Sequence, residues 1–212
     1  MISASAASGL IVKNLTCLRN DKLLFRGINF TLNPGEIIHV HGENGVGKSS
    51  LLRILCGLLQ PVEGEIFWQG QLTASNPIQF KSDMGYLGHK LGLKEPLTVA
   101  ENIKIFIDSK KFDGAGEIID DVLTRMGIKH LKNHLCDTLS AGQKQRVALA
   151  RLLAKKCTLW LLDEPFNSID VGGIEVLENV IGEHIQSGGM VVLTSHQPVV
   201  INELTIQMLY LR

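Results

Sequence analysis

One stretch constrains the fold of this chain more than any other, a glycine-rich turn that ends in lysine and serine, Gly42-Glu43-Asn44-Gly45-Val46-Gly47-Lys48-Ser49. An apolar run at residues 37–40 precedes it, and residues 50–55 after it read as a helix that ends at Gly57. Glycines let several backbone N–H groups converge on one anion, and a helix N-terminus favours negative charge. The pattern therefore predicts a strand–loop–helix unit that holds phosphates, in preference to a simple glycine-rich turn.

We call residues 42–49 the phosphate loop. Contacts to a nucleoside triphosphate are expected from Gly42, Glu43, Asn44, Gly45, Val46, Gly47, Lys48, Ser49 and Ser50. Lys48 is expected to reach the outer phosphates and to act in catalysis, and the Ser49 hydroxyl is expected to ligate Mg²⁺. A GTPase is disfavoured because the chain has no N-K-x-D motif, so ATP and Mg²⁺ are the predicted ligands.

A second candidate site follows the apolar run at residues 159–162, which lacks alternation and is typical of a parallel strand buried on both faces. Ligands bind at the carboxyl ends of such strands, so Asp163 is predicted to hold the Mg²⁺ shell, directly or through water. Glu164 is predicted to polarise the water that attacks the terminal phosphorus. The structural alternative is an acidic turn after a buried strand.

A third apolar run, residues 190–194, ends just before Ser195 and His196. The same sheet edge would carry these residues, which makes His196 a catalytic candidate in contact with the γ-phosphate. Taken alone, a histidine is more often an ordinary hydrogen-bonded residue, and only the place of His196 after a buried strand favours the functional interpretation.

Residues Ser140 and Gln143 admit two interpretations that can hold together. Ser-x-x-Gln is a capping box, and the apolar residues after it recur at helical spacing. A well-capped helix start with a glycine beside it, here Gly142, is also an anion site. Thr98 and Glu101 form another capping-box pattern, which predicts a helix there.

The phosphate loop, residues 139–143, the acidic pair, the turn at residues 167–170 and His196 follow one another as in ATP-binding-cassette (ABC) ATPases. The chain resembles that family from residue 10 to residue 212. The resemblance implies an α/β P-loop NTPase cassette with a RecA-like mixed sheet core and an N-terminal antiparallel β part. It also implies a helical subdomain inserted at about residues 90–150, with residues 1–9 left as a flexible N-terminal tail.

In the resembled family, the segment with Ser140, Gly142 and Gln143 closes over the γ-phosphate of ATP bound to a partner subunit. The resemblance therefore implies a homodimer of ATPase subunits with two shared sites. Within the family, residues 64–70, 88–94, 139–152 and 195–198 resemble the CcmA-type ATPases of bacterial cytochrome c maturation.

The closer resemblance implies a translocase ATPase whose hydrolysis is coupled to integral membrane subunits of a CcmB/CcmC-like complex, for haem export or haem-chaperone release. It implies a peripheral position on the cytoplasmic side of the inner (plasma) membrane. Two alternatives stay open: the ATPase subunit of another ABC exporter, and a soluble ABC-type nucleotide switch that acts on a macromolecule.

Two positions depart from the usual ABC pattern. His89 stands where most relatives have glutamine, which leaves it a candidate metal ligand or γ-phosphate sensor with a different reach and donor set. Arg19 aligns with the aromatic residue that stacks on adenine, and its planar guanidinium is expected to stack there instead.

Composition excludes several functional classes. Lysine plus arginine and aspartate plus glutamate both number 21, and the net charge is zero, so nucleic acid is not an expected partner. No stretch approaches about 18 uninterrupted apolar residues, so no direct transmembrane segment is expected. Residues 1–8 lack the charged start and apolar core of a secretory signal. The cysteines form no C-x-x-C pair and fit buried thiols: Cys17, Cys56, Cys136 and Cys157.

Overall fold

The computed structural model describes residues 9–107, 113–196, 199–201 and 204–212. The predicted flexible tail, residues 1–9, lies outside the described residues apart from Gly9, so it stays a prediction. In chain order the elements are β1 Leu10–Arg19, β2 Lys22–Leu32, β3 Ile37–His41, α1 Lys48–Leu55, β4 Glu63–Trp68, β5 Gln71–Leu72, α2 Pro77–Asp83, β6 Met84–Leu87, α3 Val99–Lys104, α4 Ala115–Arg125, η2 Lys129–Leu131, η3 Cys136–Thr138, α5 Ala141–Lys155, β7 Leu159–Asp163, α6 Val171–Gln186, β8 Met190–Thr194 and β9 Ile206–Tyr210.

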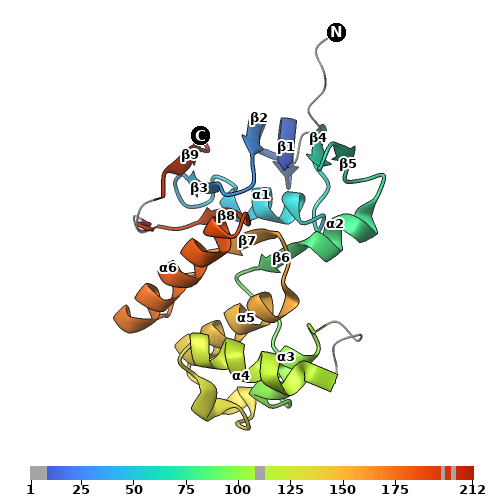
Figure 1. The fold of residues 1–212 in the computed structure, drawn as a ribbon. Coiled ribbons are helices and arrows are strands. Elements are labelled where there is room, and N and C mark those ends of the chain that lie inside the picture. Colours follow the sequence, from blue (N-terminus) through green and yellow to red (C-terminus); the bar gives the residue numbers. More distant parts are fainter. Residues whose placement is uncertain (1–8, 108–112, 197–198, 202–203) are drawn as a thin grey trace.

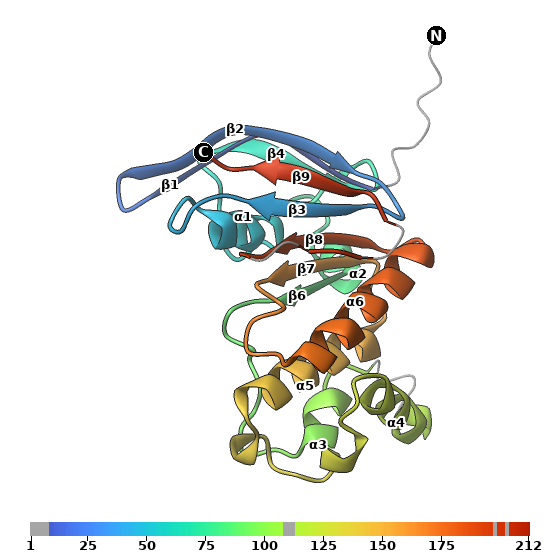
Figure 2. The same cartoon turned by 90° about the vertical axis from the view of Figure 1, so that its left-hand side faces the viewer.

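Two sheets organise the larger part of the molecule, which we call the core lobe (Figure 1). One sheet is antiparallel, in the order β2-β1-β4-β5, and the other has five parallel strands in the order β6-β7-β8-β3-β9. Figure 2 shows the antiparallel sheet above the parallel one. The predicted α/β class is confirmed, with the two strand senses separated into two sheets.

The segment between β6 and β7 forms a second, helical lobe that contains α3 and α4 and much of α5 (Figures 1 and 2). Helix α5 packs against both α3 and α4 and also against β6, so it joins the two lobes. The predicted helical subdomain at about residues 90–150 covers this region, and its exact limits stay a prediction.

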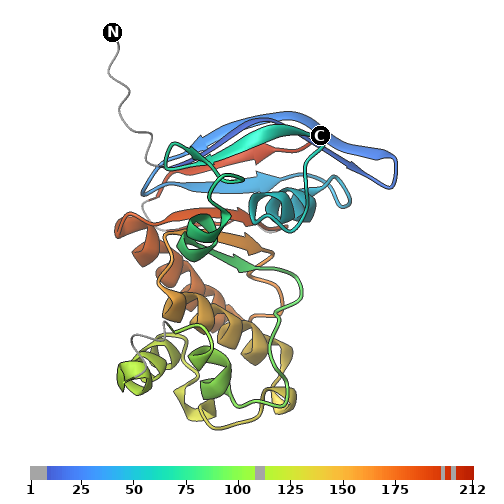
Figure 3. The same cartoon turned by 90° about the vertical axis from the view of Figure 1, so that its right-hand side faces the viewer.

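Strand β7 is buried along its whole length, as its unbroken apolar sequence predicts. Leu159 and Leu161 pack in the cluster that contains α1 and the antiparallel sheet, whereas Trp160 and Leu162 pack in the cluster that contains α5 and α6. Helices α1 and α2 cover one face of the parallel sheet (Figure 3), and α6 covers the other. Each such side chain contributes about 1.5–3 kcal/mol by burial, so the strand that leads to Asp163 is held firmly.

The predicted helix ends and starts are present. Gly57, with φ 75°, follows α1, and the N–H groups of Gly57 and Leu58 bond to the carbonyls of Ile54 and Arg53. That is the two-bond pattern of a glycine-terminated helix. Capping boxes begin α3 at Thr98 and α5 at Ser140, in both cases with the reciprocal bonds that the sequence predicts.

Apolar residues are frequent at residues 10–15 and 28–32, which is typical of strands, and the observed strands β1 and β2 are longer than these two runs. β1 continues beyond residue 15 to Arg19, and β2 begins at Lys22 instead of residue 28. Asn14 has a φ of 50° and the β1–β2 register shifts nearby, so the alternation that reveals a strand is interrupted there. Asn20 and Asp21, both with positive φ, close the hairpin as a two-residue turn.

Candidate functional site

Four loops that carry predicted site residues leave the same edge of the parallel sheet. β3 leads into the phosphate loop, β7 into Glu164, β8 into His196 and β6 into His89. β7 and β3 flank β8 on either side, with both Asp163 and Val40 in register with Thr194. Because parallel strands end at a common edge, the fold gathers segments that are far apart in sequence.

The phosphate loop turns from β3 into the N-terminus of α1. Gly47, which directly precedes α1, has a φ of 113°, and a Cβ there would come within 3.0 Å of the Phe25 ring. The first intrahelical bond runs from Leu51 N–H to the Gly47 carbonyl, so the N–H groups of residues 48–50 have no acceptor within the helix. These groups and the helix dipole together form an anion site.

The Lys48 ammonium lies against the loop itself. Its Nζ donates to the carbonyl oxygens of Gly42 at 2.7 Å and Glu43 at 3.2 Å, and the residue is 8% exposed. Glu43, Asn44 and Gly45 are exposed. A fixed positive charge therefore lies beside the N–H groups, which suits the outer phosphates of a nucleotide.

Asp163 and Ser49 form the part of the site that fits a divalent cation. Asp163 is 3% exposed, and its Oδ1 accepts hydrogen bonds from Ser49 Oγ at 3.0 Å and Thr194 Oγ1 at 2.9 Å. Its Oδ2 is buried with no hydrogen-bond partner among the described residues. A buried, unpaired carboxylate oxygen is costly, and the Ser49 oxygen keeps its lone pairs because it donates its proton. Two hard oxygens of this kind are the ligands that Mg²⁺ prefers.

An unusual backbone conformation at Glu164 directs its side chain toward His196. The φ of Glu164 is 53°, and its N–H donates to Thr194 Oγ1 at 2.9 Å. One carboxylate oxygen lies 3.2 Å from His196 Nε2, and the other accepts the His196 N–H at 3.3 Å. The Glu164 side chain is 14% exposed and that of His196 is 51% exposed, so this pair lies at the mouth of the site with access to water.

The helix start at Ser140 packs against the loop that follows the acidic pair in its own chain. A Cβ on Gly142 would come within 2.6 Å of the Ser168 carbonyl oxygen. Gln145 Nε2 donates to the Pro165 carbonyl at 2.9 Å, and Arg146 is paired with Asp170. Ser140 itself is exposed and lies in the helical lobe, so this capped terminus faces outward.

Within the described residues, no hydrogen bond or ion pair joins Arg19 or His89 to the other predicted site residues. Arg19 is exposed and pairs with Lys22 in the β1–β2 hairpin. A pocket of about 620 Å³ lies beside the phosphate loop, and Arg19 does not line it; its walls are Lys22, Leu23, Leu24, His41, residues 42–46, Tyr210, Leu211 and Arg212. His89 is exposed on the loop after β6. The roles of both residues stay predictions.

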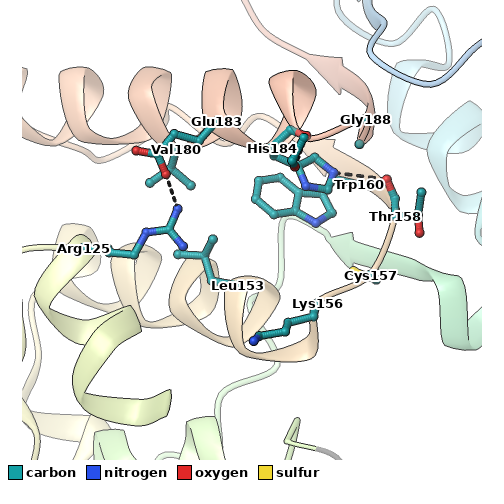
Figure 4. A pocket seen from close by; sticks show the side chains of 12 residues that line it. Arg125, Leu153, Lys156, Cys157, Thr158, Trp160, Val180, Glu183, His184 and Gly188 are labelled. Atoms are coloured by element: carbon teal, nitrogen blue, oxygen red, sulfur yellow. Dashed lines mark hydrogen bonds and ion pairs between the residues drawn. The ribbon is translucent and has the colours of Figure 1, made fainter. Parts of the chain in front are cut away.

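Another pocket, of about 470 Å³, lies between α4, α5 and α6 (Figure 4). Arg125 pairs with Glu183 across it at 2.5 Å, and Trp160 stacks on His184 at 3.8 Å. Burial lowers the pKa of His184 to about 4, although its ring bonds to the Thr158 carbonyl. Thr158 precedes β7 and Asp163 ends it, so the two sites are about 16 Å apart along the strand. This pocket is separate from the phosphate loop.

Sequence reasoning missed two buried polar side chains beneath the site. Thr194 is 0% exposed and contacts both acidic residues. His39 is 4% exposed, its Nε2 lies 3.1 Å from the Ser195 carbonyl, and burial lowers its pKa. A neutral ring that donates to this carbonyl holds the backbone next to His196. Each of the two lies within an otherwise apolar run of the sequence, and a polar residue in such a run is the signal that could have revealed them.

Comparisons with known proteins identify the family and the fold. The ABC transporter family model matches residues 25–167. The chain is 43% identical to the cytochrome c biogenesis ATP-binding export protein CcmA of Methylococcus capsulatus over 187 residues, which cover 88% of this chain and 90% of that protein. The protein of the same name from Aliivibrio fischeri is 42% identical, with 91% and 94% covered. An ABC transporter ATP-binding protein from Pyrococcus furiosus has the same fold, with a TM-score of 0.80, 24% identity and coverage of 96% and 98%.

Proposed function

The chain belongs to the ABC transporter family as an ATP-binding subunit and is an ATPase, and from that premise we propose that it works in c-type cytochrome biogenesis. Its hydrolysis of ATP would be coupled to membrane subunits that export haem or release a haem chaperone. The observation that carries this proposal is the 43% identity with a cytochrome c biogenesis ATP-binding export protein over 88% of the chain.

In this proposal, the triphosphate binds at the N-terminus of α1. The loop N–H groups and Lys48 hold its outer phosphates, as the hydrogen-bond geometry of Lys48 supports. Ser49 and Asp163 hold Mg²⁺, which would neutralise charge on the phosphate oxygens. The pocket beside the loop is large enough for a nucleoside.

Glu164 polarises the attacking water in this scheme, and His196 contacts the γ-phosphate. Their proximity, 3.2 Å between Glu164 and His196 Nε2, supports a shared task at one end of the phosphate chain. The unprotonated carboxylate accepts a hydrogen bond from water, which aligns that water for attack. Most of the catalysis is then positioning and charge stabilisation.

We further propose that the active form is a homodimer. Ser140 begins a well-capped helix whose N-terminus is exposed, and its own chain places it against residues 164–170. An exposed helix N-terminus of this kind suits the γ-phosphate bound by a second copy. Ser140, Gly142 and Gln143 would then complete the partner's site.

Membrane attachment is proposed to come from CcmB/CcmC-like partners on the cytoplasmic face of the inner membrane. Among the helices that the structure describes, none has the length and apolar character needed to cross a bilayer. The position of the helical lobe, away from the sheets, leaves it open to such partners (Figure 1).

Two experiments test this proposal together. The purified chain is expected to hydrolyse ATP with Mg²⁺, and Lys48→Ala is expected to abolish this activity. The tagged protein is expected to recover integral membrane proteins of cytochrome c maturation from detergent-solubilised membranes. A strain in which its gene is deleted is expected to contain c-type cytochromes without covalently bound haem. Normal c-type cytochromes in the deletion strain, together with recovery of a different exporter's membrane subunits, would overturn the cytochrome assignment and leave the ATPase intact.

A further inference from the structure

Thr194 joins the two acidic residues of the site through a single hydroxyl group. Its Oγ1 lies 2.9 Å from Asp163 Oδ1 and 2.9 Å from the Glu164 nitrogen. A carboxylate only accepts and a backbone N–H only donates, so the direction of both bonds is fixed by chemistry. The hydroxyl donates to Asp163 and accepts from Glu164, which uses its one proton and one of its lone pairs.

The bond to Asp163 determines which carboxylate oxygen is free. Oδ1 accepts from both Thr194 and Ser49, whereas Oδ2 is buried and unpaired within the described part of the chain. Two donors on one oxygen fix the carboxylate plane. The free oxygen is then presented in one direction, which suits a cation or one of its waters.

The bond to Glu164 supports a backbone conformation that this residue type seldom adopts. A non-glycine residue at φ 53° costs about 1–2 kcal/mol, and its N–H lies beyond the last residue of β7. Thr194 supplies the acceptor for that N–H. The turn brings the Glu164 carboxylate to His196, 3.2 Å away.

Thr194 is itself held rigidly. It is the last residue of β8, is 0% exposed and is paired in register with Asp163. A β-branched side chain has few χ1 rotamers in a strand, so the hydroxyl has little freedom. From these contacts we propose that Thr194 is a positioning residue that orients Asp163 for the cation and Glu164 for the water. This inference rests on the proposed roles of those two residues in ATP hydrolysis.

The test compares Thr194→Val, which keeps the shape and removes the hydroxyl, with Thr194→Ser, which keeps the hydroxyl. Thr194→Val is expected to lower kcat by about 10- to 100-fold and to raise the Mg²⁺ concentration needed for half-maximal ATP binding by a similar factor. Thr194→Ser is expected to stay within about threefold of the wild type. Thr16→Val is the matched control, because Thr16 is also a buried strand threonine, at 3% exposed, but lies in the antiparallel sheet.

A second readout needs neither ATP nor Mg²⁺. Amide hydrogen exchange at Glu164 is expected to be at least about 10-fold faster in Thr194→Val than in the wild type, because its acceptor is lost. If the wild type hydrolysed no ATP, the proposed function would fail, and exchange at Glu164 would still decide whether Thr194 holds that backbone.

The inference is overturned if Thr194→Val folds and matches the wild type within twofold in kcat, Mg²⁺ requirement and exchange. It is also overturned if Thr194→Ser loses as much activity as Thr194→Val, since the hydroxyl would then not be the cause. If Thr194→Val does not fold, Thr194→Ala replaces it and is judged by the same comparison with Thr194→Ser.

Discussion

Gln145 Nε2 donates a hydrogen bond to the carbonyl oxygen of Pro165 at 2.9 Å. Gln145 belongs to α5, the helix that joins the two lobes, and Pro165 directly follows Glu164. Gln145 is 7% exposed, so this bond is shielded from water. It gives the helical lobe a direct connection to the backbone that carries the acidic pair.

Gln145→Leu should therefore lower the stability of the protein and weaken the connection between the helical lobe and the backbone next to Glu164. An unpaired buried carbonyl costs about 1–3 kcal/mol, so urea unfolding should show a loss of that size, and kcat for ATP should fall with little change in ATP affinity. Gln186→Leu, at an exposed position near the end of α6, is the matched control. Equal stability of the two variants would contradict the importance of the Pro165 bond.

Alanine substitutions at two glycines should act in opposite directions. A Cβ at Gly142 would come within 2.6 Å of the Ser168 carbonyl oxygen. At Gly172 in α6, a Cβ would have no heavy atom of the described residues within 4 Å, apart from its chain neighbours and the backbone of its own helix. Gly142→Ala should lower the unfolding free energy by about 1–3 kcal/mol. Gly172→Ala should raise it by about 0.5–1 kcal/mol, because alanine favours the helix. Thermal or urea unfolding of the two proteins measures both signs, and destabilisation of both equally would refute the steric argument.

Glu164→Gln should bind ATP but turn it over at least about 100-fold more slowly, because an amide is a poor base. ATP-bound dimer should then accumulate and be visible by light scattering. The control is Glu175→Gln, at an exposed site on α6, which should behave as the wild type. An unchanged ATPase rate in Glu164→Gln would remove Glu164 from its proposed role.

Mixing two inactive variants tests the shared site. Ser140→Arg places a bulky cation where the partner's phosphates would bind, and Lys48→Ala weakens the phosphate loop. Each homodimer should be inactive, but a heterodimer would contain one site built from the intact loop and the intact helix start. Mixtures should regain ATPase activity in proportion to the heterodimer formed. No recovery despite a heterodimer verified by mass spectrometry would argue against completion of the site by a second copy.

Stability should fall as the pH decreases from 6.5 to 4. Burial lowers the pKa of His184 from its ordinary 6.5 to about 4. Between these pH values the unfolded chain binds a proton at His184 that the folded protein does not bind. The contribution of neutral His184 to the free energy of unfolding is therefore fully present above pH 6.5. It decreases on acidification by about 2–3 kcal/mol. His184→Gln should flatten this part of the pH profile of urea unfolding. A slope identical to that of the wild type would exclude His184 as its source, since other groups contribute equally to both proteins.

The local parts of the fold and site follow from the sequence. The phosphate loop, the capping box at Ser140 and the helix end at Gly57 each depend on residues within one or two turns of each other. Backbone freedom at glycine, side-chain capping and unbroken apolar runs act over that short range, so their patterns can be interpreted without a tertiary structure. The order of these motifs along the chain indicated the ABC family, and comparison with known relatives confirmed that family.

Tertiary structure decided the direct contacts between distant polar groups. The sequence predicts that Ser49 and Asp163, 114 residues apart, both hold Mg²⁺, but the hydrogen bond between them is seen only in the structure. Nothing in the sequence predicted the contact between His39 and Ser195, 156 residues apart. Both contacts depend on the strand order β6-β7-β8-β3-β9. Thr194 faces Asp163 because of the register of β8 on β7, and a shift of one residue would turn its hydroxyl to the other face. Register depends on how whole strands pack on both faces of the sheet, and no short segment of the sequence contains that information.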